Sequence, residues 1–153
     1  MTRSIDEQGR EGMTPRSLEE CRLIDLPKIT NNSGNLTFIE TGRHLPFEYQ
    51  RVFYIYDIPG GAWRGAHAHK KCHLFLIAIA GSFDVTLNDG RSAATFNLNR
   101  SHYGLYICPG IWEYLDNFSS GAVCLAFASE PYDESDYWRD YDQFLSDIGL
   151  GKE

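Results

Sequence analysis

Two histidines stand two residues apart in the stretch RGAHAHKK, residues 64–71. In an extended strand alternate side chains point to the same face, so His67 and His69 lie side by side if this stretch is a strand. Two neighbouring imidazoles suit two kinds of chemistry. They bind a divalent metal ion, or they transfer protons near neutral pH, where the pKa of histidine lies. This stretch is therefore the first candidate for a catalytic site.

Positive charge next to the histidine pair helps to decide between metal binding and proton transfer. Arg64 precedes the pair and Lys71 follows it. Cationic side chains oppose a bound dication and favour an anionic ligand. The alternative is a Zn²⁺ or Fe²⁺ site, in which His73 and Glu113 join the pair as ligands. The residues favour an anionic substrate over a metal ion and leave the metal site open as an alternative.

Length and composition narrow the class of protein. The 153 residues suffice for one domain with a hydrophobic core, and the net charge of -7 argues against a general nucleic-acid binder. The sequence has no apolar run of about 18 residues or more, so we expect no membrane span. Residues 1–20 lack the apolar stretch of a signal peptide, and the four cysteines have no C-x-x-C spacing. We therefore expect a cytoplasmic protein with reduced thiols.

Short strands separated by turn residues follow one another from residue 21 onward. Several are rich in β-branched and aromatic residues, and Asn88-Asp89-Gly90 is typical of a hairpin turn. The expected strands are residues 21–26, 35–40, 49–58, 62–69, 72–80, a hairpin at 82–99, 104–108 and 122–129. This succession predicts a sandwich or barrel of antiparallel sheets and excludes a Rossmann domain.

The two ends of the chain differ from this pattern. Residues 1–20 are polar and are expected to form a tail, which leaves residues 21–149 as a single domain. Residues 133–149 predict a helix, with Asp133 or Ser135 as its N-cap and Gly149 at its end.

The spacing around the histidine pair resembles the first signature of the cupin barrels. Gly61 is followed by five residues and then by His67-Ala68-His69. Metal-binding cupins carry a glutamate a few residues later, where this chain has His73, and a further histidine after a second turn. Here that turn, Pro109-Gly110, is followed by IWEYLDN, which contains no histidine. The resemblance supports the barrel and leaves the metal site without one of its standard ligands.

Three longer blocks resemble the sugar 3,4-ketoisomerases, which are small cupin enzymes. The blocks are RGAHAHKK, GLYICPGIW (104–112) and YDESDYWRDYD (132–142), and the resemblance runs from residue 22 to residue 146. It implies an all-β fold, a cupin or jelly-roll double-stranded β-barrel with a short C-terminal helix. It also implies a homodimer.

The resemblance implies a reaction as well. These isomerases convert dTDP-4-keto-6-deoxyglucose to the dTDP-3-keto-6-deoxy-hexose by proton transfer through an enediol. The product is used in the biosynthesis of 3-amino-3,6-dideoxy sugars, and no metal or organic cofactor is implied. The alternatives are a 4-keto-sugar-nucleotide epimerase and a metal-dependent cupin dioxygenase.

Single residues take their expected roles from the same resemblance. His67 is expected to be the principal base and His69 its partner in proton transfer. Arg64 is expected to clamp the diphosphate or to hold oxygens of the sugar.

Further substrate-binding residues are expected on other strands. Tyr54 shares a strand face with Tyr56 and not with Arg51, and we expect its hydroxyl to face the pocket. Residues 132–141 are expected to serve in helix packing or in an interface. The complete set of expected substrate-binding residues is Arg64, Tyr54, Lys71, Tyr106 and Trp112.

Overall fold

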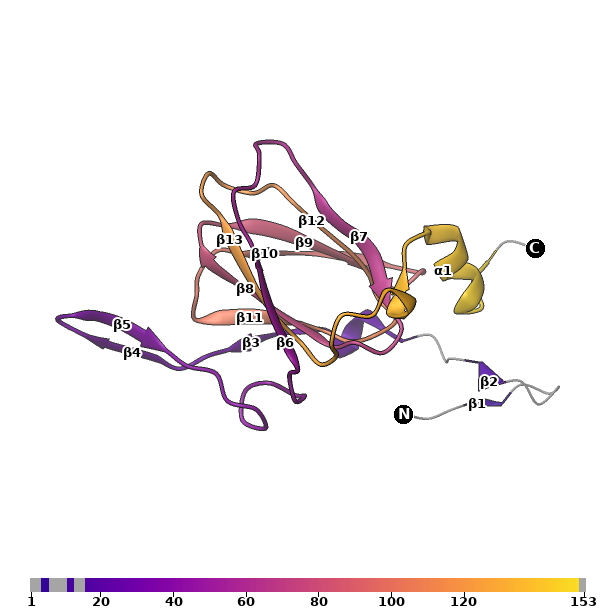
Figure 1. Ribbon diagram of the computed structural model, residues 1–153, viewed down its shortest axis with the longest axis horizontal. Coiled ribbons are helices and arrows are strands. Elements are labelled where there is room, and N and C mark those ends of the chain that lie inside the picture. Colours follow the sequence, from indigo (N-terminus) through magenta and orange to yellow (C-terminus); the bar gives the residue numbers. More distant parts are fainter. Residues whose placement is uncertain (1–3, 6–10, 13–15, 152–153) are drawn as a thin grey trace.

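The computed structural model describes residues 4–5, 11–12 and 16–151, and its body consists of two five-stranded antiparallel sheets (Figure 1). In one sheet the strand order is β10-β9-β12-β7-β14, and in the other it is β3-β11-β8-β13-β6. The predicted all-β barrel with a short C-terminal helix is confirmed.

The strands of the two sheets have the following bounds. The first sheet contains β7 (Arg64–His69), β9 (Phe83–Asn88), β10 (Ala93–Leu98), β12 (Trp112–Asp116) and β14 (Tyr137–Trp138). The second contains β3 (Arg22–Asp25), β6 (Arg51–Ile55), β8 (Leu74–Ala80), β11 (Tyr103–Ile107) and β13 (Val123–Ala128). Outside them lie β1 (Ser4–Ile5), β2 (Glu11–Gly12), β4 (Lys28–Asn31), β5 (Gly34–Thr37) and the helix α1 (Tyr141–Asp147).

The hydrophobic core lies between the two sheets. On β9 the side chains of Phe83, Val85 and Leu87 are fully buried, whereas the residues between them are half-buried. This alternation is what a strand with one face on the core requires. The residues of β8 from Leu74 to Ala78 are all buried, so both faces of this central strand are covered over that stretch.

The C-terminal segment departs from the predicted helix at 133–149. Asp133 caps a 3-10 turn at Glu134–Asp136, and Tyr137 and Trp138 then form β14 by pairing with His69 and Ala68 of β7. The open edge of β7 supplies backbone partners that the local helical pattern does not reveal. The helix α1 begins only after Asp140, whose carboxylate accepts a hydrogen bond from the backbone N–H of Gln143 at 2.8 Å. Gly149, with φ +86°, ends it as predicted.

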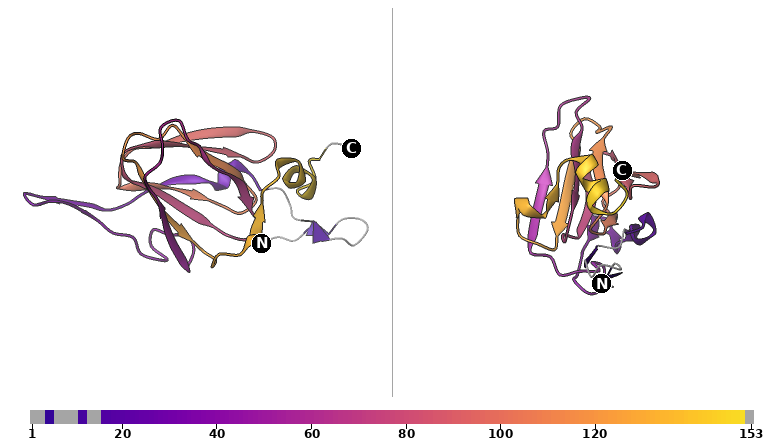
Figure 2. Two further views of the ribbon diagram at one scale, coloured as in Figure 1. Left: turned by 45° about the horizontal axis from the view of Figure 1, so that its top comes forward. Right: turned by 90° about the vertical axis from the view of Figure 1, so that its right-hand side faces the viewer.

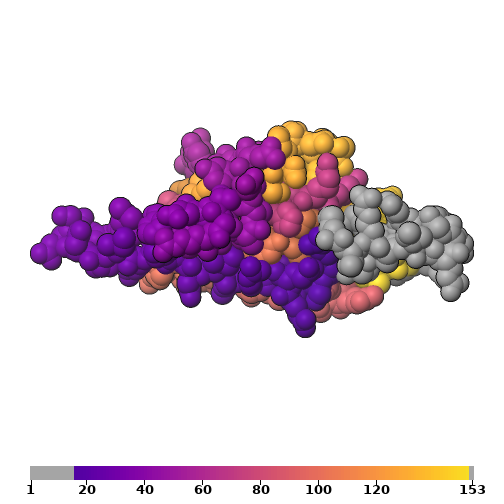
Figure 3. Space-filling model, turned by 90° about the horizontal axis from the view of Figure 1, so that it is seen from below, coloured from indigo at the N-terminus to yellow at the C-terminus, as the bar shows by residue number. Residues whose placement is uncertain are grey.

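A hairpin of β4 and β5 projects from the body of the molecule (Figures 1 and 2). Seen from below, it forms a narrow arm at one end (Figure 3). Its paired residues Ile29 and Leu36 are 53% and 57% exposed. Much of the predicted tail at 1–20 lies outside the described residues.

Two features bear on the expected compartment of the protein, namely the state of its cysteines and the search for a membrane-spanning helix. The four cysteines, Cys21, Cys72, Cys108 and Cys124, are free and buried. Among the described residues, no helix has the length and apolar character that a membrane span needs.

Replacing Gly104 by alanine is predicted to destabilise the fold. A Cβ at this position on β11 would meet the ring of Phe75 and would lie 2.7 Å from the carbonyl oxygen of Leu76. Overpacking of this kind typically costs about 1–3 kcal/mol. Urea unfolding of Gly104→Ala checks this, with Gly60→Ala as the control because nothing lies within 4 Å of a Cβ there. Equal stability of the two variants would contradict the packing described.

Candidate active site

A cavity of about 500 Å³ lies inside the barrel and is lined by residues of both sheets. Its apolar part includes Phe53, Ile55, Leu74 and Leu76, and its polar part includes both histidines of β7. A larger hollow of about 630 Å³ is lined by Trp63, Ala66, Tyr114 and Asp116 and holds neither histidine. The cavity with the histidine pair, the site cavity from here on, is therefore the candidate active site. Its polar lining includes His67, His69, Arg64, Glu113, Tyr137 and Arg139.

A β-bulge places Arg64 on the same side of β7 as the histidines. In a regular strand, residues three apart point to opposite faces. Here Glu113 of β12 pairs with His67, Tyr114 pairs with Gly65 and Leu115 pairs with Arg64, so β7 carries one extra residue. Gly65 and Ala66 have positive φ angles of +95° and +52°. The extra residue reverses the alternation, and Arg64 therefore lines the site cavity.

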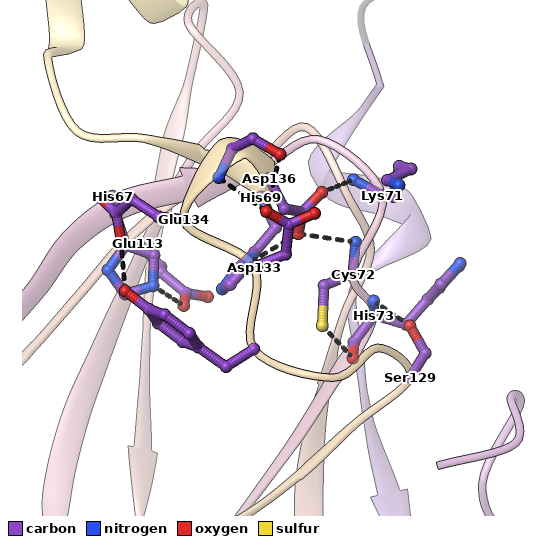
Figure 4. Close-up of polar contacts among 12 residues, drawn as sticks. His67, His69, Lys71, Cys72, His73, Glu113, Ser129, Asp133, Glu134 and Asp136 are labelled. Carbon is purple, nitrogen blue, oxygen red and sulfur yellow. Dashed lines mark hydrogen bonds and ion pairs between the residues drawn. The ribbon is translucent and has the colours of Figure 1, made fainter. Parts of the chain in front are cut away.

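Asp136 holds His69 in one orientation. The Nδ1 atom of His69 lies 3.1 Å from Oδ2 of Asp136, a carboxylate that is only 4% exposed (Figure 4). Asp136 also accepts hydrogen bonds from the backbone N–H groups of Lys71 and Cys72, at 2.7 and 3.3 Å. The contact identifies Nδ1 as the protonated nitrogen and leaves Nε2 for a ligand.

The pKa of His69 is lowered from its ordinary value. Burial is the main cause, because it disfavours the charged imidazolium, and the neighbouring His67 acts in the same direction. The negative charges of Glu113 and Asp136 oppose this effect without outweighing it. His69 is therefore a neutral imidazole at neutral pH, the form that accepts a proton.

His67 has a different carboxylate partner. Its Nε2 atom lies 3.0 Å from Oε1 of Glu113, which extends inward from β12. Burial is the largest single influence on the pKa of His67 and would lower it. The hydrogen bond and negative charge of Glu113, helped by the backbone carbonyl of Gly65, outweigh burial and raise the pKa. The pKa of His67 is therefore higher than that of His69, and such a difference suits acid and base roles within one site.

Tyr137 and Arg139 complete the polar lining. The ring of Tyr137 lies with its centroid 5.1 Å from that of His67 and 4.4 Å from that of His69. The guanidinium of Arg139 lies 4.3 Å from the centroid of Tyr137 and forms a bidentate ion pair with Glu134, at 2.6 and 2.9 Å. Together with Arg64, Arg139 gives the site cavity two cationic side chains.

Three of these site residues were missed by the sequence analysis. Asp136, Tyr137 and Arg139 belong to the stretch 132–141, for which we expected helix packing or an interface. The structure places these three beside the histidines and not in helix packing, because the pairing of β14 with β7 brings them there. The available signal was the block YDESDYWRDYD itself, one of the three blocks that carry the family resemblance.

Three of the predicted substrate-binding residues do not line the site cavity. Lys71 follows the end of β7, and its side chain is exposed. The hydroxyl of Tyr106 forms a hydrogen bond of 2.7 Å with Nδ1 of His73 instead. Trp112 points away from the barrel interior because its neighbour Glu113 points inward, and it packs on Tyr141.

Tyr54 borders the site cavity but does not extend into it. Its side chain is 62% exposed, and its ring lies 5.5 Å from that of Tyr56 on the outer face of β6. The inner face of β6 carries Phe53 and Ile55. The shared face of the two tyrosines is as predicted, but it is not the face that meets the histidines.

Two groups of side chains have donors suited to a metal ion. His67, His69 and Glu113 form one group, and His69, Cys72 and Asp136 form the other; the ligand atoms in each lie within 4.8 Å of one another. The first group matches the nitrogen and oxygen donors that Zn²⁺ or Fe²⁺ accepts. Arg64 and Arg139 line the same cavity and oppose a dication there. That the protein uses no metal stays a prediction.

Comparison with known proteins relates this site to one group of enzymes. The FdtA family, described as WxcM-like, C-terminal, matches residues 19–149. A curated relative from Aneurinibacillus thermoaerophilus, a TDP-4-oxo-6-deoxy-alpha-D-glucose-3,4-oxoisomerase, is 40% identical over 137 residues. The match covers 88% of this chain and 99% of that protein.

Solved structures that are similar to this chain are also 3,4-ketoisomerases. A 3,4-ketoisomerase from Helicobacter canadensis is 40% identical with a TM-score of 0.82, covering 84% of this chain and 97% of that one. QdtA, a sugar 3,4-ketoisomerase from Thermoanaerobacterium thermosaccharolyticum in complex with TDP, is 38% identical with a TM-score of 0.83, covering 86% and 96%. A mutant of QdtA has been solved in complex with TDP-4-keto-6-deoxyglucose and is 37% identical, with the same TM-score and coverage.

The two site histidines are predicted to titrate in a definite order. As the pH falls, His67 gains its second proton above the ordinary value of 6.5, and His69 gains its own below that value. Between the two folded-state pKa values His67 is charged and His69 is neutral. NMR titration of ¹⁵N-labelled imidazoles checks this, with the signals assigned through His67→Asn and His69→Asn. The reverse order would contradict the carboxylate contacts described above.

Proposed function

The chain belongs to the FdtA family, and on this premise we propose that it is a sugar 3,4-ketoisomerase that converts dTDP-4-keto-6-deoxyglucose to the dTDP-3-keto-6-deoxy-hexose. The observation that carries the proposal is the histidine pair inside the barrel, with opposite pKa shifts and two buried carboxylate partners. Such a pair supplies a proton acceptor and a proton donor within one cavity. An isomerisation by proton transfer needs both.

The chemistry follows from the acidity of the hydrogen on C3, next to the C4 carbonyl. A base removes this proton, the electron pair of the C3–H bond forms the C3–C4 double bond, and the C4 oxygen takes up a proton to give the enediol. The C3 hydroxyl then loses its proton as the C3 carbonyl forms, and C4 receives a proton. No atom is gained or lost overall, so neither an oxidant nor a reductant is required.

The proposal assigns these proton transfers to His67 as principal base and His69 as its partner. His69 is neutral, and Asp136 orients it so that Nε2 is available to the ligand. The contact of Nε2 with Glu113 raises the pKa of His67, which makes the neutral form of His67 the stronger base of the two. Positioned imidazoles of this kind typically contribute about 10²–10⁴-fold to the rate.

Arg64 and Arg139 support a nucleotide-sugar substrate. Both line the site cavity, in a protein whose net charge is -7. Guanidinium groups bind the oxygens of a diphosphate through charge-assisted hydrogen bonds. A cytoplasmic location is part of the proposal and is supported by the four free cysteines, which suit a reducing compartment.

The proposed activity is predicted to appear in a direct assay. Incubation with dTDP-4-keto-6-deoxyglucose in D₂O should give the 3-keto isomer with deuterium at C4, because imidazole protons exchange with solvent. His67→Asn and His69→Asn should each lower turnover by about 10²–10⁴-fold while remaining folded. NMR of the product sugar measures both conversion and label. The matched control is His102→Asn, since His102 lies outside the site cavity.

Three results would count against the proposal. Absence of the 3-keto product would remove the proposed activity, and a C5 or C3 epimer in its place would indicate the epimerase alternative. Full activity of both asparagine variants would remove the histidines from the mechanism. The prediction of a metal-free reaction requires activity to survive EDTA, and loss of activity that Zn²⁺ or Fe²⁺ restores would overturn it.

We further propose that the protein is a homodimer. The arm of β4 and β5 exposes Ile29 and Leu36 far from the barrel core, and β3 at its base is an edge strand of the second sheet. Exposed apolar side chains on a projecting hairpin and an unpaired strand edge are both features that a second copy of the chain can cover.

Sedimentation at micromolar concentration is predicted to show a dimer of the 17.4 kDa chain. Ile29→Asp combined with Leu36→Asp should shift the protein toward the monomer, because both charges would be buried on association. Val52→Asp, which alters a similarly exposed apolar side chain on β6, at the opposite edge of the sheet from β3, is the control. A monomeric wild-type protein would refute the proposal, and a dimer insensitive to the arm substitutions would remove the arm from the interface.

A further inference from the structure

Glu113 is a buried carboxylate that uses only one of its two oxygens. It is 3% exposed, and its Oε1 atom lies 3.0 Å from Nε2 of His67. Its Oε2 atom is buried and has no hydrogen-bond partner among the described residues. A buried carboxylate oxygen without a partner is costly, because it has lost water and gained nothing in return.

The position of Glu113 within its sheet limits where a partner can come from. On β12 it is paired with Leu87 of β9 on one side and with His67 of β7 on the other. Leu87 is fully buried and apolar, and His67 already contacts Oε1. The remaining direction is the site cavity, which Glu113 lines. Although Arg64 and Tyr137 line the same cavity, neither forms a hydrogen bond with Oε2, so a molecule in the cavity is left to supply its donor.

The charges around the cavity indicate which part of a ligand that donor belongs to. Arg139 is engaged by Glu134, and His69 by Asp136. A second negative charge close to Glu113 would be repelled, so the diphosphate is the wrong partner for Oε2. A neutral hydroxyl, which can donate one hydrogen bond, suits a carboxylate oxygen.

We propose that Oε2 of Glu113 accepts a hydrogen bond from the C3 hydroxyl of the sugar, which makes Glu113 a substrate-contacting residue that selects 3-hydroxy sugars. The inference rests on the proposed function, since it places the reacting carbon of that substrate beside His67. One carboxylate then contacts both the hydroxyl on C3 and the imidazole that acts at C3. The shared contact aligns the C3–H bond with the histidine pair.

Binding of unreactive sugar nucleotides tests this inference without relying on turnover. dTDP-glucose and dTDP-3-deoxyglucose lack the keto group and differ only in the C3 hydroxyl. The wild-type protein should bind the 3-deoxy compound about 10- to 100-fold more weakly, as expected for a hydrogen bond to a charged group. Glu113→Gln should bind both compounds with the weaker affinity, and its affinity for dTDP alone should be unchanged. Titration calorimetry measures all three ligands.

Controls separate a direct contact from a structural role. Asp116→Asn alters an acidic residue of the same strand that lies outside the site cavity, and it should keep the wild-type preference. If Glu113→Gln does not fold, Glu113→Asp, whose carboxylate is withdrawn by one methylene, replaces it in the same comparison. In either variant a weakened affinity for dTDP itself would show a structural effect and would overturn the inference.

The outcomes also distinguish the inference from the proposed function. Wild-type protein that binds the two compounds equally overturns the role of Glu113 but leaves the isomerase proposal intact when the 3-keto product is formed. Wild-type protein that neither binds dTDP-glucose nor isomerises the keto sugar overturns both. A hydroxyl preference that persists at full strength in Glu113→Gln assigns the contact to another residue and overturns the inference.

Discussion

The contact between Asp136 and the end of β7 is the interaction on which the site most depends. Asp136 accepts two backbone hydrogen bonds, from Lys71 and Cys72, and orients the imidazole of His69. The same contact anchors the segment that forms β14 along the open edge of β7. Because the carboxylate is buried, each of these hydrogen bonds is stronger than it would be in water. One side chain thus closes the edge of a sheet, places Tyr137 against both histidines and selects a histidine tautomer.

The two histidines show how position within one cavity separates chemically identical groups. Both are buried, and burial alone would lower the pKa of each. The direct contact with Glu113 reverses this effect for His67 and not for His69. At a pH between the two pKa values, one member of such a pair is protonated and the other can accept a proton. A reversible proton transfer between neighbouring carbons needs both forms. The carboxylates that create the difference lie on separate elements, β12 and the 3-10 turn before β14.

Much of the fold follows from local patterns. Alternation on β9, the Asn88-Asp89-Gly90 turn and the termination of the last helix at Gly149 were all predictable, since each depends on neighbours in the chain. The residue at which that helix begins could not be predicted from its local sequence. Residues 133–140 were expected to begin the helix, with Asp133 or Ser135 as its N-cap, yet the edge of β7, far away in the sequence, pairs with Tyr137 and Trp138. Local propensity decides an element only where no tertiary partner competes for its backbone.

The sequence by itself determined that His67 and His69 share a face, because a two-residue spacing in a strand has that consequence in any barrel. It also determined the family, through three blocks of residues. Tertiary structure decided what surrounds the pair. Arg64 lies three residues before His67 and enters the cavity only because a bulge at Gly65 and Ala66 reverses the alternation. Tyr106 and Trp112 stand in a recognisable block but face elsewhere, since side-chain direction is set by register between strands. Register depends on pairing across the sheet, and no single stretch of sequence contains both partners.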